Sequence, residues 1–382
     1  MNALRRAFDL NFQSGREIGA AVCVYAADGP VATLHGGYMD ATRTQPWSDD
    51  TLVLIWSATK GLAAACALRA IEQAALNLET RVGDFWPEFM QNGKSALTLG
   101  HVLSHRAGLC LVEDTSARLL DHESVVAGIE KQAPVLGIEE GPAYGPRVFG
   151  FILDEIVRRL SGISLGDYWR RYFAEPLDLE LWIGLPGPFH SRVATMCAPR
   201  STNGDGAFLK AFADPSSLTR RAFTCLPGLP SPSSMNAPAV RSASLPSLGG
   251  IGSARALAKF YAMLAQGGRW NGREYLGAKA SRWMRHRLTQ GFDAVLQMET
   301  CFAAGFMMDP LDSSGQKIRS LLGPSRMAFG HAGAGGSLGF ADSERGIGFA
   351  YVMNQMEPGV LPNDRCLALV EAVYDELQST RI

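Results

Sequence analysis

A serine and a lysine three residues apart form the first pair in this sequence that could do chemistry. Residues 57–60 read SATK, an SxxK pattern, and they follow a short apolar run at 52–56. They open an alanine-rich stretch with high helix propensity that extends to about residue 76. Residues at i and i+3 share one face of a helix, so the Lys60 amine can reach the Ser57 hydroxyl. The free N–H groups and the positive dipole end of a helix N-terminus also favour an anion nearby.

This pair predicts nucleophilic catalysis, although it has a simpler interpretation. A serine hydroxyl is a weak nucleophile unless a neighbouring base takes its proton. A lysine amine acts as that base only when burial or a nearby positive charge lowers its pKa. The bare pattern also arises by chance, as a serine cap followed by a surface lysine. The strand-to-helix setting favours the catalytic interpretation.

Tyr144 lies in the segment GPAYGPRVFG, just before an amphipathic helix expected at 150–160. It is either a partly buried aromatic residue at a loop–helix junction or a base of the phenolate type. The ordinary pKa of tyrosine is about 10, and two nearby cations, such as protonated Lys60 and His331, would lower it.

His331 begins a glycine-rich segment, HAGAGGS at 331–337. The segment resembles a nucleotide-binding loop superficially, but no Gly-Lys-Ser/Thr follows it and it lies among strand-like runs, which argues against that function. Small residues in a strand also let a substrate or another backbone approach closely. His331 is therefore either a structural histidine or a side chain that points into a cleft.

His101 and His105 are spaced i, i+4, as two metal ligands on a helix would be. No Glu occupies the position expected in a HExxH motif, and no third ligand is evident. We interpret them as structural histidines at a helix end. The sequence predicts no metal and no cofactor.

Composition narrows the class of protein. The chain has 382 residues with 36 Lys and Arg against 37 Asp and Glu, so bulk charge does not predict nucleic-acid binding. A hydrophobic fraction of 47% indicates a compact globular protein. No apolar run is long enough to span a membrane, and no secretory signal is evident. Seven cysteines without a CxxC pair favour a reducing compartment, so we expect a cytoplasmic location. The oligomeric state stays open.

Hydrophobic periodicity predicts the elements that position these residues. The expected helices lie at 2–13, 98–106, 122–132, 150–160, 253–266, 277–287 and 363–378, the expected hairpin at 18–25 and 31–37, and the later strands at 300–308, 327–332, 336–342 and 346–353. The simplest architecture is an α/β (α+β) fold in which hairpin and late strands form one antiparallel sheet flanked by the terminal helices. Residues 1–64 and 291–382 would form this discontinuous sheet domain. Residues 65–290 would form an inserted, mostly helical domain, with a Pro-, Gly- and Ser-rich excursion at 187–247 that rims the site.

Six stretches together resemble one enzyme superfamily. They are SATK at 57–60, LTLGHVLSHRAGL at 97–109, AYGPRVFGFILDEIVRRLSG at 143–162, PLDLELWIGLP at 176–186, FGHAGAGGSLGFAD at 329–342 and YVMNQM at 351–356. The chain resembles the serine β-lactamase and penicillin-binding-protein superfamily, and most of all the class C β-lactamase-like family VIII carboxylesterases. The match runs along nearly the whole chain in the expected order. The fold that it implies agrees with the α/β division above.

The resemblance implies site roles. Ser57 would be the acylated nucleophile and Lys60 and Tyr144 the proton-transfer pair. The N–H groups of Ser57 and Ala334 would form the oxyanion hole, and His331, Gly333 and Ala334 would bind substrate.

The sequence departs from the family pattern at two places. Position 146 is Pro where the second motif usually has Asn, which argues against efficient β-lactamase or peptidase activity and is compatible with ester substrates. His331 replaces the usual Lys and would be a pH-sensitive anchor for a substrate carboxylate.

The expected function is a serine hydrolase that cleaves small-molecule carboxylic esters through an acyl-enzyme. The main alternative is an acyltransferase or peptide-cyclising enzyme that uses the same acyl-serine. A β-lactamase or D-amino-acid peptidase, and a non-catalytic binding protein on the same fold, are the lesser alternatives.

Overall fold

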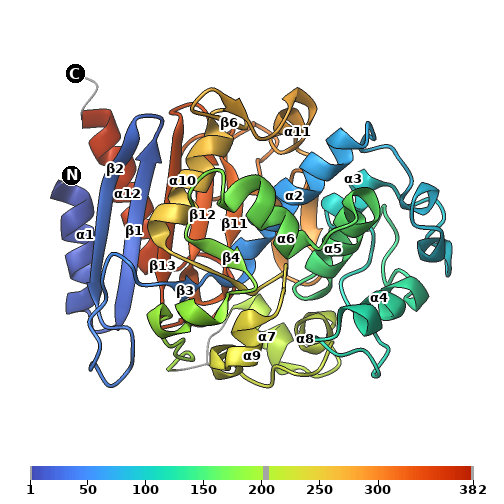
Figure 1. The fold of residues 1–382 in the computed structure, drawn as a ribbon, viewed down its shortest axis with the longest axis horizontal. Coiled ribbons are helices and arrows are strands. Elements are labelled where there is room, and N and C mark those ends of the chain that lie inside the picture. The colour runs from blue at the N-terminus through green and yellow to red at the C-terminus, as the bar shows by residue number, and fades with distance from the viewer. Residues whose placement is uncertain (1, 201–205, 380–382) are drawn as a thin grey trace.

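The computed structural model describes residues 2–200 and 206–379. Its largest element is an eight-stranded antiparallel sheet with the strand order β2-β1-β13-β12-β11-β10-β9-β8 (Figure 1). The strands are β1 Gly19–Ala26, β2 Gly29–Gly37, β8 Thr289–Asp293, β9 Met298–Phe302, β10 Met307–Met308, β11 Phe329–Ala332, β12 Leu338–Asp342 and β13 Ile347–Met353. The predicted hairpin and late strands therefore join in one sheet, which confirms the expected fold class.

Helices cover both faces of this sheet. The terminal helices α1 (Asn2–Gln13) and α12 (Asp364–Ser379) lie side by side, and α10 (Ala254–Ala265) packs on β1, β12 and β13 (Figure 1). Successive side chains of a strand point to opposite faces. In β1, Val22 packs with the cluster that contains the α1 and α12 side chains, whereas Cys23 packs with the cluster that contains the α10 side chains.

The remaining helices lie mostly at the other end of the molecule (Figure 1). They are α2 Thr59–Gln73, α3 Leu99–Leu103, α4 His122–Lys131, α5 Val148–Ser161, α6 Leu165–Trp169, α7 Ala207–Ala213, α8 Leu218–Thr224, α9 Pro238–Ser242 and α11 Ala278–Trp283. A small sheet in the order β3-β5-β4 joins β3 Val53–Leu54, β4 Leu181–Ile183 and β5 Gly250–Gly252, and β6 Arg269–Trp270 pairs with β7 Arg273–Glu274. Residues 2–200 and 206–379 include no helix long and apolar enough to cross a bilayer.

Several details differ from the sequence prediction. Strand β8 is an addition, and the run expected at 300–308 divides into β9 and β10, because the chain turns through Gly305 at φ +82°. The excursion at 187–247 carries the short helices α7, α8 and α9, and its residues 201–205 lie outside the described part. The division into two domains stays a prediction. Helix α10 lies inside the segment assigned to the helical domain, yet it packs on the sheet.

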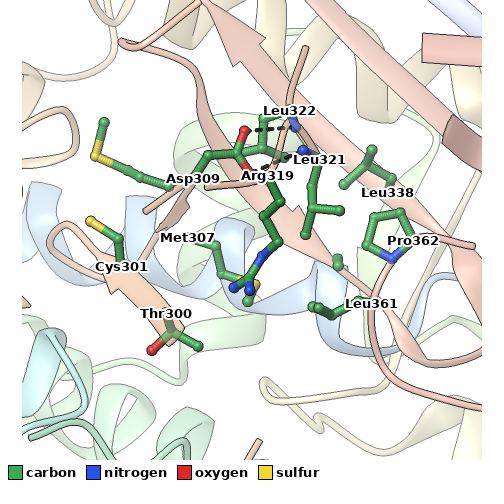
Figure 2. A pocket seen from close by; sticks show the side chains of 12 residues that line it. Thr300, Cys301, Met307, Asp309, Arg319, Leu321, Leu322, Leu338, Leu361 and Pro362 are labelled. Atoms are coloured by element: carbon green, nitrogen blue, oxygen red, sulfur yellow. Dashed lines mark hydrogen bonds between the residues drawn. The ribbon is translucent and has the colours of Figure 1, made fainter. Parts of the chain in front are cut away.

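A small cavity lies where the loop after β10 folds back over the sheet. Figure 2 shows the Arg319 side chain reaching between Met307 and Leu361, while the Asp309 carboxylate accepts hydrogen bonds from the backbone N–H groups of Leu321 and Leu322, both at 3.0 Å. The space has room for about one water molecule. It is a packing defect of this loop and too small for an organic ligand.

A buried ion pair ties the two ends of the chain together. The Arg365 guanidinium of α12 lies 2.7 Å from the Glu17 carboxylate just before β1, and both side chains are fully buried. The Tyr351 hydroxyl donates to the same carboxylate, and Arg365 also donates to the carbonyls of Arg16 and Gln355, each at 2.9 Å. Burial raises the pKa of Glu17 to about 7, although Arg365 acts in the opposite direction.

Removing one partner of this pair should destabilise the fold strongly. Arg365→Met leaves the Glu17 carboxylate buried without its cation, so we expect the free energy of unfolding to fall by about 3–5 kcal/mol. Arg5→Met is the control, since Arg5 and Asp9 form an exposed pair and its loss should change stability by less than about 0.5 kcal/mol. Urea denaturation followed by circular dichroism measures both variants. Equal urea midpoints for Arg365→Met and Arg5→Met would contradict a structural role for the buried pair.

Candidate active site

Ser57 lies in a tight turn between a strand and a helix. The turn is a 3-10 segment, Trp56–Ala58, between β3 and α2, and Ser57 is half-buried. The Ile55 N–H donates to the Gly250 carbonyl of β5 at 2.9 Å, and the Gly250 N–H donates to the Thr59 hydroxyl at 2.8 Å. The turn is thus braced from the small sheet.

Backbone strain marks the residue before the serine. Trp56 has φ +51°, in the left-handed region that a residue with a Cβ rarely adopts. The Thr59 hydroxyl donates to the Trp56 carbonyl at 2.5 Å and holds the turn closed. Such conformations cost about 1–3 kcal/mol and concentrate at functional sites, where the surrounding structure enforces them.

The Lys60 side chain is fully buried and directed at the serine. Its Nζ lies 3.2 Å from Ser57 Oγ and donates to the carbonyls of Pro146 at 2.9 Å and Ser247 at 2.8 Å. Burial lowers the pKa of Lys60 well below its usual value. The two groups that the SxxK spacing predicts to meet therefore do meet, and the amine has the lowered pKa that a base requires.

Tyr144 completes the cluster around the serine. The Lys60 Nζ lies 4.9 Å from the centre of the Tyr144 ring, and the Tyr144 hydroxyl is close enough to Ser57 for that side chain to affect its pKa. Its backbone N–H donates to the Asp293 carboxylate at 3.1 Å, which fixes the start of this segment to the end of β8. Burial raises the pKa of Tyr144, although the nearby Ser57 side chain acts in the opposite direction. The phenolate interpretation is therefore wrong: the group is a neutral phenol.

His331 lies on β11 beside Tyr144, with the two ring centres 5.9 Å apart. Its Nδ1 lies 2.7 Å from the Ala332 carbonyl, and since a carbonyl only accepts, Nδ1 carries the proton. Burial, together with the nearby Lys60, lowers the pKa of His331 to about 3. The expectation of a cationic anchor for a carboxylate is therefore wrong, because this imidazole is neutral at physiological pH.

The loop after β11 lies against the serine turn. A Cβ added to Gly333 would lie 2.4 Å from the Ile55 carbonyl oxygen, and the Ser337 hydroxyl donates to that carbonyl at 3.0 Å. The N–H groups of Gly333 and Gly335, on either side of Ala334, donate to the carbonyls of Ser337 and Gly359. Ala334 is therefore held near the turn that carries Ser57, while its role in an oxyanion hole stays a prediction.

The two histidines of the 97–109 stretch are structural. His101 Nδ1 accepts from the Thr98 N–H in the capping box of α3. His105 is buried among the rings of Tyr144, Phe149 and Phe302 and accepts from the Gly145 N–H at 3.3 Å. Within residues 2–200 and 206–379 no group of three His, Cys, Asp or Glu side chains is placed to hold a metal ion.

Sequence reasoning missed four residues that build this site: Thr59, Ser247, Asp293 and Ser337. Each acts on the backbone of a distant segment, and all four of these bonds span more than 90 residues. No motif or spacing in a single sequence reports such contacts. Two of them lay in motifs that the sequence had singled out: Thr59 in SATK at 57–60 and Ser337 in the glycine-rich run at 331–337.

Comparison with known proteins identifies the family. The Beta-lactamase family model matches residues 4–372. The chain is 31% identical over 358 residues to Esterase/beta-lactamase LipL of Mycobacterium tuberculosis (strain ATCC 25618 / H37Rv), an alignment that covers 92% of this chain and 80% of that protein.

Solved structures of similar fold support the same family. A penicillin-binding protein homolog from Caulobacter crescentus shares 34% identity with a TM-score of 0.87, and a family VIII carboxylesterase shares 33% with a TM-score of 0.85; each match covers 98% of this chain and 96% of the other. The chain therefore belongs to the beta-lactamase family of serine hydrolases. The predicted resemblance and fold are confirmed.

The contact between the β11 loop and the serine turn should depend on the absence of a side chain at position 333. In Gly333→Ala the new methyl group meets the Ser337 hydroxyl and the Ile55 carbonyl, so we expect a loss of about 1–3 kcal/mol in unfolding free energy. Gly187→Ala is the control, because a Cβ there meets no atom within 4 Å among the described residues. Chemical denaturation compares the two variants. If both variants have the unfolding free energy of the wild type, the β11 loop does not pack tightly against the serine turn.

Proposed function

We propose that this chain hydrolyses carboxylic esters through an acyl-enzyme on Ser57, with Lys60 and Tyr144 as the proton-transfer pair. The observation that carries the proposal is the buried Lys60 amine, 3.2 Å from the Ser57 hydroxyl, with two carbonyl oxygens as its other partners. The chain's likeness to proteins described as an esterase/beta-lactamase and a family VIII carboxylesterase supports an ester substrate.

The carbonyls of Pro146 and Ser247 orient the Lys60 amine. A neutral amine has two N–H donors and one lone pair. The carbonyls of Pro146 and Ser247 can only accept, so they engage both N–H groups and leave the lone pair for the Ser57 hydroxyl. When the amine takes the serine proton it becomes an ammonium with three donors, and the same three oxygens surround it. The same three oxygens therefore satisfy the hydrogen-bonding groups of Lys60 both before and after it accepts the proton.

The remaining groups fit the other steps. Ser57 Oγ would attack the ester carbonyl carbon, and the N–H groups of Ser57 and Ala334 would stabilise the oxyanion, each by about 3 kcal/mol. The Tyr144 phenol, whose raised pKa favours the protonated form, would pass a proton to the departing alkoxide so that an alcohol leaves. Water would then cleave the acyl-Ser57 ester by the reverse proton path and release the carboxylic acid.

The charge of the site selects the substrate class. His331 is neutral and Lys60 has a strongly lowered pKa, so neither provides a permanent cation for a substrate carboxylate. Burying an unpaired carboxylate is costly. We therefore propose neutral esters as substrates, with His331, Gly333 and Ala334 contacting the bound ester.

Ser57→Ala should abolish ester hydrolysis, because the variant has no hydroxyl to acylate. We expect a fall in kcat of at least about 1,000-fold, measured with p-nitrophenyl acetate and butyrate. Intact mass after incubation with a fluorophosphonate should show one adduct on the wild type and none on the variant. Ser116→Ala, which removes an exposed hydroxyl on a surface turn, is the matched control. Full activity of Ser57→Ala would refute the assignment.

His331→Lys should change the preference between neutral and charged substrates. The wild type should cleave a neutral ester at least about ten-fold better, in kcat/KM, than the matched ester with a free carboxylate on its acyl group, because that carboxylate loses hydration without a cationic partner. His331→Lys should narrow this ratio and His331→Gln should preserve it. If the wild type cleaves the neutral and the carboxylate-bearing ester equally well, other groups in the site pair with the carboxylate and the proposed preference for neutral esters is wrong.

A further inference from the structure

The Ser247 side chain joins the two segments that hold the Lys60 amine. Its hydroxyl donates to the Arg147 carbonyl at 2.7 Å and accepts from the Gly150 N–H at 2.6 Å, while its own carbonyl accepts from Lys60 Nζ at 2.8 Å. The residue is 1% exposed and lies about 100 positions from α5 along the chain. One serine therefore contacts the base with its backbone and the neighbouring helix with its side chain.

These bonds cap helix α5 from outside. The first N–H groups of a helix have no partner within it, and Arg147, which precedes α5, supplies no side-chain cap. Ser247 provides the missing acceptor for Gly150 in the first turn. The approach is close, since a Cβ on Gly150 would lie 2.3 Å from the Ser247 backbone nitrogen. The glycine is what allows the two backbones to touch.

This cap fixes the distance between the two carbonyls that the amine uses. The Pro146 carbonyl immediately precedes Arg147, whose own carbonyl accepts from the Ser247 hydroxyl. The Ser247 carbonyl is one bond from the atom that carries its side chain. A shift of the 245–248 segment relative to α5 would move one acceptor and leave the other in place. The amine lone pair would then turn away from Ser57.

We propose that Ser247 is a positioning residue whose hydroxyl locks its segment to the start of α5 and thereby aims the Lys60 lone pair at Ser57. This inference rests on the proposed acyl-enzyme function. It adds a residue that touches neither substrate nor the reacting hydroxyl, and it explains how the site holds its base although position 146 is Pro.

The test compares Ser247→Ala with Ser244→Ala. Ser244 lies three residues earlier, and within the described part of the chain its buried hydroxyl has no hydrogen-bond partner, so its loss breaks no bond. For a neutral p-nitrophenyl ester we expect Ser247→Ala to lower kcat by about 10- to 100-fold. KM should stay within about two-fold, because the base acts in the transition state. The second-order rate of fluorophosphonate labelling should fall in parallel, and Ser244→Ala should match the wild type in every measurement.

The outcomes separate the two proposals. Wild-type kcat and labelling rate in a folded Ser247→Ala, or a loss confined to KM, would overturn the role of Ser247 and leave Ser57 untouched. Activity in Ser57→Ala would overturn the function itself. If Ser247→Ala does not fold, Ser247→Cys keeps the shape and weakens both hydrogen bonds; a reduced kcat at unchanged KM supports the inference, and wild-type kcat refutes it. Thermal unfolding identifies a variant that has lost its fold.

Discussion

The candidate site depends on the burial of one group, the Lys60 amine. A charged lysine in a low-dielectric interior is expensive, and an unpartnered one is worse. The chain surrounds Lys60 Nζ with three oxygens, two of which are backbone carbonyls without charge. These partners satisfy the hydrogen-bonding capacity of the amine but do not offset a positive charge as a carboxylate would. The pKa of Lys60 therefore falls, which is the condition that its proposed role as a base requires.

Three separate parts of the chain must meet for this to work. Helix α2 supplies the amine, the segment before α5 supplies the Pro146 carbonyl, and the segment before β5 supplies the Ser247 carbonyl. The same β5 braces the serine turn through Gly250. The strained backbone of Trp56 is thus held by neighbours that also determine where the Lys60 amine lies, so the strain and the position of the amine have one structural origin.

The sequence predicted what depends on local pattern and missed what depends on distant contacts. The i, i+3 spacing of Ser57 and Lys60 follows from helix geometry, and the helices, the hairpin and most of the late strands follow from hydrophobic periodicity. The charge state of His331 could not be predicted, because its pKa of about 3 results from burial against segments far away in the chain. The phenolate interpretation of Tyr144 failed for the same reason. It assumed two cations, Lys60 and His331, whereas burial lowers the pKa of both.

The burial of these ionisable side chains has a consequence for the proposed catalysis. Burial lowers the pKa of Lys60 and His331 and raises that of Tyr144, so it disfavours a charge on all three side chains that a neutral ester would meet. In the proposed mechanism, charge separates only as the reaction proceeds, when the amine gains a proton and the ester oxygen becomes an oxyanion. The carbonyls around Lys60 and the N–H groups proposed at Ser57 and Ala334 point at these two developing charges. Their interactions strengthen between ground state and transition state, which is the condition under which binding energy accelerates a reaction. In a site built around a permanent cation, part of the binding energy would instead stabilise the bound substrate, which does not accelerate the reaction.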